Sequence, residues 1–455
     1  METTVDIGRR LVQMFWDPEP TNDIVRDQPV WCLGSSYRLN SSPSAKSESS
    51  PSPGAAPSKD AIPTHTAAHL PETPPESAST SLDSSLAYEE APLDGGWPPA
   101  FLDDFESRIW MTYRSEFEPI AKSHDPKAMA ALSFSMRLKT QLSDQSGFSS
   151  DSGWGCMIRS GQSLLANAVL CQRLGRGWRR GTKDREEKEI LSLFADDPRA
   201  PYSIHSFVRH GATACGKYPG EWFGPSATAR CIQALTNTNE LNLRVYSTGD
   251  GPDVYEDNFM KIAKPDGITF YPTLILVGTR LGIDKITPVY WEALVSSLQM
   301  PQSIGIAGGR PSSSHYFIGV QGLYFFYLDP HTTRPALPYH HNPDEYSQEE
   351  IDSCHNRKLR RIHVREMDPS MLIGFFIRDE EDWKDWRKGV KHVQGKAIIH
   401  VSDHDPVTQF GEQGGAIDQV ETLSDEDENN SSGDGLGDRY EGESDGNDRN
   451  IISDE

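Results

Sequence analysis

The chain is short of hydrophobic and basic residues. Only 36% of its 455 residues are hydrophobic, below the roughly 45–50% of a chain that is folded throughout. Its 44 Lys and Arg residues face 67 Asp and Glu residues, which gives a net charge of −23. An acidic chain repels phosphates unless one face is locally basic, so a nucleic-acid-binding protein is disfavoured.

Long apolar runs and cysteine motifs are missing as well. No stretch approaches the ~20 consecutive apolar residues of a membrane span, and the acidic N-terminal residues 1–6 lack an apolar signal core. The six cysteines include no Cys-x-x-Cys pair, which is typical of free thiols in an intracellular chain. These absences predict a cytoplasmic protein, and they leave each cysteine available as a nucleophile.

Two segments account for much of the hydrophobic deficit. Residues 41–95 contain 9 Pro and 13 Ser, and residues 401–455 contain 17 acidic and 2 basic residues. These compositions predict a disordered insertion and a disordered acidic tail, because few apolar side chains offset the entropy of ordering. Residues 1–40 are apolar enough to pack as an N-terminal arm on the main domain, which we place at residues 96–400.

Hydrophobic periodicity predicts helices in the first half of this domain and strands in the second. The helices are expected at about residues 105–113, 127–142, 156–170, 187–194 and 226–237. The strands are expected at 241–247, 273–277, 304–307, 316–320, 323–328 and 372–377, with a hairpin turn at Gln321-Gly322. Helices followed by a mostly antiparallel sheet are typical of an α+β fold.

The most informative cysteine is Cys156. It follows the turn Asp151-Ser152-Gly153-Trp154-Gly155 and occupies the first position of a predicted helix. The positive end of the helix dipole and free backbone N–H groups favour a thiolate there, which makes a nucleophile. Without a partner base, a buried structural cysteine explains the segment equally well.

The candidate partner is Asp329-Pro330-His331, at the end of a predicted aromatic strand. Residues two apart on an extended segment point to one side, so the Asp can orient one ring nitrogen while the other faces a thiol. Alone, this pattern is more often a turn with a surface imidazole. Together with Cys156 it supplies a nucleophile, a base and an orienting carboxylate.

Other candidates have weaker patterns. His315 lies on a neighbouring strand without an adjacent acid, which favours a core or supporting role. His205, His210 and Cys215 match no standard zinc spacing, so no metal is expected. The glycine-rich segment 304–310 lacks both the Gly-Lys-Ser/Thr ending of a P-loop and Gly-x-Gly-x-x-Gly spacing, so no nucleotide cofactor is expected.

Several blocks resemble the autophagy-related cysteine endopeptidases that process the ubiquitin-like autophagy modifier. The resemblance covers nearly the whole chain except 41–95 and the tail past about 400. The matching blocks are Arg108-Ile109-Trp110-Met111-Thr112-Tyr113-Arg114, Asp151-Ser152-Gly153-Trp154-Gly155-Cys156-Met157-Ile158-Arg159-Ser160-Gly161-Gln162, Gly220-Glu221-Trp222-Phe223-Gly224-Pro225-Ser226, Ser314-His315-Tyr316-Phe317-Ile318-Gly319 and Leu328-Asp329-Pro330-His331-Thr332-Thr333.

This resemblance implies a papain-like fold with a small extra subdomain and assigns a role to each matching residue. Cys156 would be the nucleophile, His331 the general base and Asp329 the orienting carboxylate. Tyr113 would complete the oxyanion hole, and Trp222 would cover the groove in front of the nucleophile. The loop that lifts for substrate would comprise Arg310, Pro311, Ser312 and Ser313, with Ser312 replacing the family's usual Asn.

The resemblance also implies the reaction and its partner. The enzyme would cut the modifier precursor after a glycine and later release the modifier from phosphatidylethanolamine, needing no cofactor and touching membranes only through its substrate. The arm (1–40), the insertion (41–95) and the tail (401–455) hold no aromatic-x-x-aliphatic modifier-binding motif, so docking would rest on the folded body. The resemblance leaves two further locations open, the nucleus and the preautophagosomal structure. The alternatives are a non-catalytic modifier-binding scaffold and an acyltransferase with the same three residues.

Overall fold

The computed structural model describes residues 19–23, 27–39, 94–142, 147–239, 241–310 and 313–406. Most of the predicted insertion, the first 18 residues and the chain beyond 406 therefore lie outside the described residues. So do Pro311 and Ser312 of the expected gating loop.

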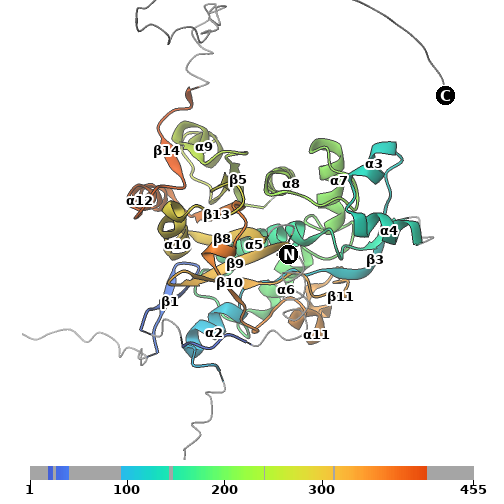
Figure 1. The fold of residues 1–455 in the computed structure, drawn as a ribbon, viewed down its shortest axis with the longest axis horizontal. Coiled ribbons are helices and arrows are strands. Elements are labelled where there is room, and N and C mark those ends of the chain that lie inside the picture. Colours follow the sequence, from blue (N-terminus) through green and yellow to red (C-terminus); the bar gives the residue numbers. More distant parts are fainter. Residues whose placement is uncertain are drawn as a thin grey trace, which may run out of the picture. The chain divides into compact units, whose positions relative to one another are not determined.

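A largely antiparallel sheet forms the centre of the described chain (Figure 1). Its path runs β12-β10-β9-β8-β13-β7-β5, and only β5 and β7 pair in parallel along it. The hairpin between β9 and β10 turns at Gln321 to Tyr324, as predicted. The strands are β5 (Arg244–Ser247), β7 (Thr273–Arg280), β8 (Ser303–Arg310), β9 (Ser313–Gln321), β10 (Tyr324–Leu328), β12 (Arg361–His363) and β13 (Ser370–Ile377).

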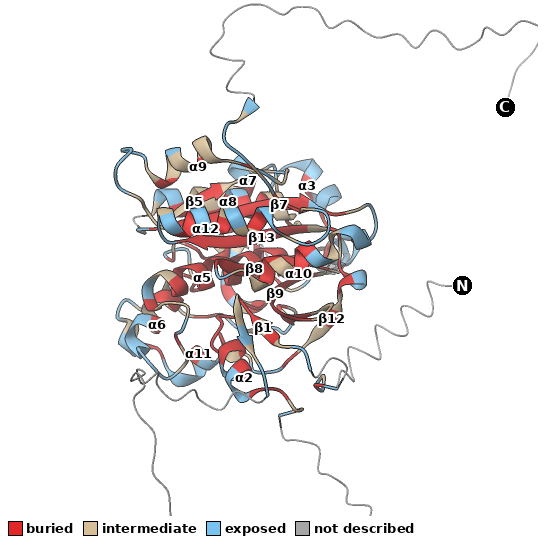
Figure 2. Cartoon of the chain, turned by 90° about the vertical axis from the view of Figure 1, so that its left-hand side faces the viewer, coloured by how far each residue is buried: buried red, intermediate tan, exposed pale blue. Residues whose placement is uncertain are grey.

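Helices cover both faces of this sheet, and Figure 2 shows the buried strands between paler, half-exposed helices. Helix α5 packs on β8 and β9 from one face, and α10 and α12 pack on the other. The helices are α2 (Pro99–Glu106), α3 (Pro126–Ala131), α4 (Phe134–Leu142), α5 (Cys156–Leu174), α6 (Asp184–Ser192), α7 (Ile204–Ala214), α8 (Pro225–Thr238), α9 (Glu256–Ala263), α10 (Trp291–Gln299), α11 (Gln348–Asp352) and α12 (Glu380–Lys391), with short 3₁₀ turns at Pro288–Tyr290, Pro343–Glu345 and Val364–Glu366.

Helix α5 is the long buried helix that the sequence predicts from residue 156. Gly155 stands at its N-cap, and Gly175, with φ of 87°, ends it. At Gly161 an added Cβ would lie 2.3 Å from the Thr228 side chain, so glycine lets α8 approach closely. The helix is therefore held between the sheet and α8, with its first residue fixed at one end of the core.

The helix predicted at residues 105–113 is wrong beyond Glu106. Residues 109–113 instead run extended beneath α5 into β3 (Arg114–Ala121). The Asn167 amide bonds both the N–H and the carbonyl of Ile109, and the Ser163 hydroxyl accepts the Met111 N–H. These polar side chains replace the hydrogen bonds of a helix, which periodicity alone does not reveal.

Both ends of the described chain add strands. β1 (Val30–Cys32) pairs with β2 (Ser35–Tyr37) and with β9 of the main sheet, burying Val30 and Cys32. β14 (His400–Ser402) pairs in parallel with β6 (Asp253–Tyr255), so regular structure passes residue 400, where the sequence placed the end of the main domain. Within the described ranges, no helix has the length and apolarity to cross a membrane.

Candidate active site

A small three-stranded sheet gathers the three segments that the sequence singled out. β3 pairs with β4 (Gly147–Ser150) on one side and with β11 (Arg334–Pro335) on the other. Tyr113 immediately precedes β3, and β4 leads into the turn before Cys156. His331 lies three residues before β11. Residues more than 200 positions apart therefore meet at the N-terminus of α5.

Cys156 begins α5 and is 2% exposed. Burial raises the pKa of its thiol, but the hydrogen bond and positive charge of His331 outweigh burial, so the pKa lies below its ordinary value. A backbone N–H from Ser314 also favours the thiolate. These contacts and the positive end of a buried helix all favour the thiolate form of the sulfur.

His331 is bound between Asp329 and Cys156. Its Nδ1 lies 2.6 Å from Asp329 Oδ1, and its backbone N–H donates to the same oxygen at 3.0 Å. Burial lowers the pKa of His331, but the Asp329 carboxylate and the Cys156 sulfur have a larger opposite effect. The pKa is therefore raised to about 9. The same contacts outweigh burial at Asp329 and hold its pKa below the ordinary value.

The pKa is lowered at Cys156 and raised at His331, and both shifts favour a thiolate–imidazolium pair. Such a pair provides a nucleophile together with a proton donor for the leaving group. Ser313 Oγ lies 3.1 Å from His331 Nε2, the nitrogen that faces the thiol. The first residue of β9 therefore closes the site on the side opposite Asp329.

Tyr113 contacts both members of this pair. Its ring packs edge-on against His331, with centroids 5.3 Å apart. Burial and the negative charge of the hydrogen-bonded Cys156 raise the pKa of the phenol, which stays protonated and can donate. The N–H of Gly153 donates to the same hydroxyl. Tyr113 is thereby fixed as a donor beside the sulfur.

Trp222 lies in front of Cys156 and is 40% exposed. Its indole N–H donates to the sulfur and contributes to the lowered pKa of the thiol. The indole is therefore partly exposed beside the sulfur and is not packed into the core. Of the other expected gating residues, Arg310 ends β8 and lies 3.9 Å from the Glu366 carboxylate, and Ser313 contacts His331 as described.

His315 lies beside the pair but is buried, and burial lowers its pKa to about 3, which keeps it neutral. Within the described ranges, His315, Asp329 and His331 are the only group of His, Cys, Asp and Glu side chains close enough to hold a metal, with ligand atoms within 4.8 Å of one another. Two of the three are already joined by a hydrogen bond. His205, His210 and Cys215 form no such group in the described structure.

Sequence reasoning missed a buried ion network behind the nucleophile. Arg159, three residues into α5, lies 2.7 Å from both Asp151 Oδ2 and Asp196 Oδ1. Asp151 Oδ1 accepts the Arg114 N–H, and Asp196 Oδ2 accepts the Leu337 N–H. At Gly155 a Cβ would lie 2.4 Å from the Asp151 carboxylate, which requires glycine. The network joins the Cys156 turn, β3 and the segment after His331, and only the Asp151 and Arg159 charges in the motif hinted at it.

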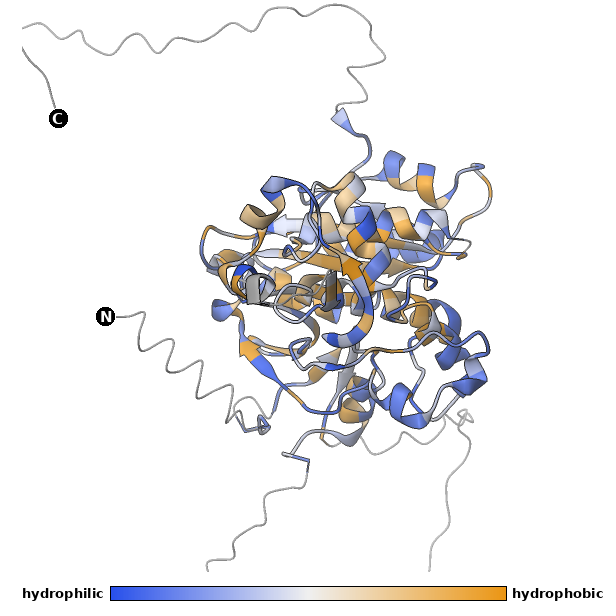
Figure 3. Ribbon diagram, turned by 90° about the vertical axis from the view of Figure 1, so that its right-hand side faces the viewer, coloured by the Kyte–Doolittle hydropathy of each residue, from blue (hydrophilic) through white to orange (hydrophobic). Residues whose placement is uncertain are grey.

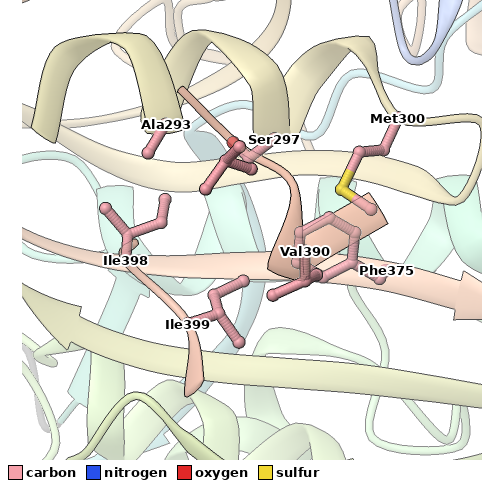
Figure 4. A pocket seen from close by; sticks show the side chains of 8 residues that line it. Ala293, Ser297, Met300, Phe375, Val390, Ile398 and Ile399 are labelled. Atoms are coloured by element: carbon pink, nitrogen blue, oxygen red, sulfur yellow. The ribbon is translucent and has the colours of Figure 1, made fainter. Parts of the chain in front are cut away.

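Two cavities lie away from these residues. One, of about 10 Å³, is lined by the apolar side chains of α10, α12 and the chain before β14 (Figure 4), on the sheet face opposite α5. The other, of about 310 Å³, lies between the C-terminal end of α5 and the start of β8. A helix of 19 residues separates it from Cys156, a distance of ~27 Å. Neither cavity is the catalytic groove.

Comparison with known proteins agrees with the geometry. Residues 98–389 match the family model of the peptidase C54 catalytic domain. The chain belongs to the peptidase C54 family. The probable cysteine protease atg4 of Sclerotinia sclerotiorum is 66% identical over 436 residues, which cover 94% of this chain and 98% of that protein.

Two further fungal relatives support the same assignment. The probable cysteine protease ATG4 of Cryphonectria parasitica is 65% identical over 92% of this chain and 94% of its own length. The cysteine protease ATG4 of Pyricularia oryzae is 59% identical over 92% and 96%. The C54 chain is a cysteine endopeptidase, and the predicted autophagy-related family and papain-like α+β fold are confirmed.

Proposed function

We propose that this C54 enzyme cleaves the ubiquitin-like autophagy modifier after a glycine near its C-terminus and later releases the modifier from phosphatidylethanolamine. Processing would supply the free glycine needed for conjugation, and release would recycle the modifier during autophagosome formation and related transport. This proposal rests on one observation: His331 is hydrogen-bonded to Asp329 on one side and to Cys156 on the other.

Both reactions break an amide bond by the same steps. The Cys156 thiolate attacks the glycine carbonyl carbon, and the C–N bond breaks as the His331 imidazolium gives its proton to the leaving amine. A thioester forms. Water then attacks that thioester while His331 takes a proton, which frees the glycine carboxylate and restores the thiolate. The leaving amine is a peptide nitrogen in one substrate and the ethanolamine nitrogen in the other.

Two hydrogen-bond donors would stabilise the oxyanion that forms in each step. The backbone N–H of Cys156 belongs to the first turn of α5 and has no partner within the helix. The Tyr113 hydroxyl lies beside the same sulfur and stays protonated. Donors fixed before the reaction favour the transition state because they need no reorganisation.

Glycine selectivity is assigned to Trp222. Its indole lies at the Cys156 sulfur, where it would leave little room for a side chain at the cleaved position and would exclude larger residues by clash. The loop from Arg310 to Ser313 would move when substrate enters and would release His331 Nε2 from the Ser313 hydroxyl.

The test is cleavage of purified modifier precursor and of vesicle-bound, phosphatidylethanolamine-linked modifier, followed by intact-mass analysis. The proposal expects a shortened product ending in glycine from both substrates, and none with the Cys156→Ser variant. Transfer of the modifier to an added amine, without hydrolysis, would support the acyltransferase alternative. Binding without any change of mass would support the scaffold.

A further inference from the structure

Helices α3 and α4, joined by residues 132–133, form a hairpin that exposes three large apolar side chains. On α4, Phe134 is 82% exposed and Leu138 is 49% exposed, and their spacing of four residues places them on one face. Met129 on α3 is 39% exposed. Met136, between the two exposed residues of α4, is 3% exposed and packs in the main core. The hairpin is thus anchored on one face and uncovered on the other.

The same hairpin is basic within an acidic protein. Residues 122–142 hold four basic residues and one acidic residue, a net of +3, whereas the chain carries −23. Lys127 is exposed, and Arg137 donates to the Ala130 and Leu132 carbonyls at the end of α3. Within the part of the chain that the structure describes, no carboxylate lies within ion-pair distance of either side chain. Neither charge is therefore neutralised by a carboxylate in the described structure, and the exposed Lys127 ammonium is available to an external anion.

The hairpin borders the catalytic groove at two points. Asp125, the N-cap of α3, accepts the Tyr218 hydroxyl at 2.6 Å, and Tyr218 begins the loop that carries Trp222. Met136 Sδ lies 3.5 Å from where a Cβ on Gly153 would stand, three residues before Cys156. Figure 1 places α3 and α4 at the right-hand edge of the chain, and Figure 3 views the chain from that side.

We propose that the α3–α4 hairpin is a membrane-docking surface that contacts the headgroup region of an anionic bilayer directly. Exposed apolar side chains flanked by unpaired cations are the pattern of interfacial helices, in which apolar groups enter the headgroup boundary and Lys and Arg reach the phosphates. The inference rests on the proposed release from phosphatidylethanolamine. In that reaction the scissile amide lies at the bilayer surface, so residues that border the groove must approach lipid headgroups.

This contact adds to binding through the modifier, and its affinity for the bilayer is expected to be weak. A few exposed side chains and cations hold a protein on a bilayer reversibly, and the acidic remainder of the chain opposes longer residence. The hairpin therefore orients the groove towards the lipid while the modifier supplies most of the affinity.

Flotation of the full chain with vesicles, without any modifier, tests the surface. The vesicles contain phosphatidylcholine alone or phosphatidylcholine with phosphatidylserine. The test variant is Phe134→Asp/Leu138→Asp, and the matched control is Ile268→Asp/Ile283→Asp, which changes two residues exposed to 84% and 80% outside the hairpin. Both variants add the same charge, so a difference in their vesicle binding shows that the position of the changed residues matters.

Wild type and control are expected to float with phosphatidylserine vesicles at low salt, whereas the hairpin variant should bind roughly tenfold less or worse. Salt should weaken the wild-type binding. Absence of wild-type binding, or equal binding by the hairpin variant, overturns the proposal.

Kinetics separates a lipid surface from a docking site for the modifier. The hairpin variant should cleave soluble precursor with unchanged kcat/KM and release vesicle-bound modifier about tenfold more slowly. Equal slowing on both substrates would assign the hairpin to the modifier and overturn the lipid proposal. Wild-type flotation combined with no release from vesicles would instead reject the proposed function, because flotation involves no substrate.

Discussion

Arg159, one turn into α5 behind Cys156, is fully buried between two carboxylates, whereas Trp222, in front of the same sulfur, is 40% exposed. Behind the nucleophile, charges are satisfied by partners from three segments of the chain. In front of it, Trp222 and the α3–α4 hairpin face outward, and Arg310 is bonded only at the surface. We propose that the two regions have different tasks: the buried bonds fix the reacting atoms, while the exposed side chains select what reaches them.

The largest expected effect comes from the reacting atom itself. Cys156→Ser should lower kcat/KM for precursor by roughly 10⁴-fold or more, because a serine alkoxide is far harder to form near pH 7 than a thiolate. Cys171→Ser, a change on the same helix 15 residues away, is the control and should retain activity. Cleavage by Cys156→Ser near the wild-type rate, with both variants equally folded by thermal melting, would reject the nucleophile.

Asp329→Asn should have the next largest effect. Its loss of kcat/KM should approach the ~10⁴-fold loss caused by the corresponding change in a serine protease. In wild type, kcat/KM should rise as Cys156 ionises at its lowered pKa and fall as His331 loses its proton near its pKa of about 9. Removing the carboxylate removes a cause of the raised histidine pKa, so the alkaline limb of the profile should move to lower pH. An unmoved limb would show that Asp329 does not set the charge of His331.

Removing Arg159 from the buried ion network should lower the free energy of unfolding. Arg159→Met removes the cationic partner of the buried Asp151 and leaves Asp196 with only its 3.9 Å pair to Arg114, a loss of about 3–5 kcal/mol in the free energy of unfolding. Arg199→Met is the matched control: its 2.7 Å pair with Asp197 lies at the surface, so the loss should be much smaller. Denaturant unfolding measures both values. Equal losses would mean that burial of the network does not matter.

Changing the exposed Trp222 should alter substrate selectivity more than it alters stability. Trp222→Ala opens the groove, so a precursor with Ala in place of the cleaved Gly should become a better substrate relative to wild-type precursor. The measurement is the ratio of kcat/KM for the two precursors in both enzymes, where a change of about tenfold is expected. A constant ratio in a folded variant would remove Trp222 from glycine selection.

Much of the site followed from local sequence, because its key residues stand at element ends. Cys156 opens a helix that the periodicity from 156 predicts, and Asp329 and His331 follow a strand that aromatic residues predict. The antiparallel sheet and its Gln321-Gly322 turn were also predictable from alternation and turn chemistry.

What the sequence could not reveal depends on contacts between distant segments. Residues 109–113 have helical spacing but are extended, because α5 supplies hydrogen bonds to their backbone. The partners of Arg159 come from positions 151 and 196, and no local pattern relates those positions. Helix α7 was missed because its short amphipathic run lies among glycine and polar residues.

The order of the catalytic residues along the chain has a consequence for synthesis. The nucleophile is made first, and both Asp329 and His331 follow more than 170 residues later, beyond β9. A growing chain therefore presents Cys156 long before the proposed base His331 exists to take its proton. Proteolytic activity can appear only after Asp329 and His331 have emerged and β10 has packed beside β9, so chains that end before His331 are expected to be inert.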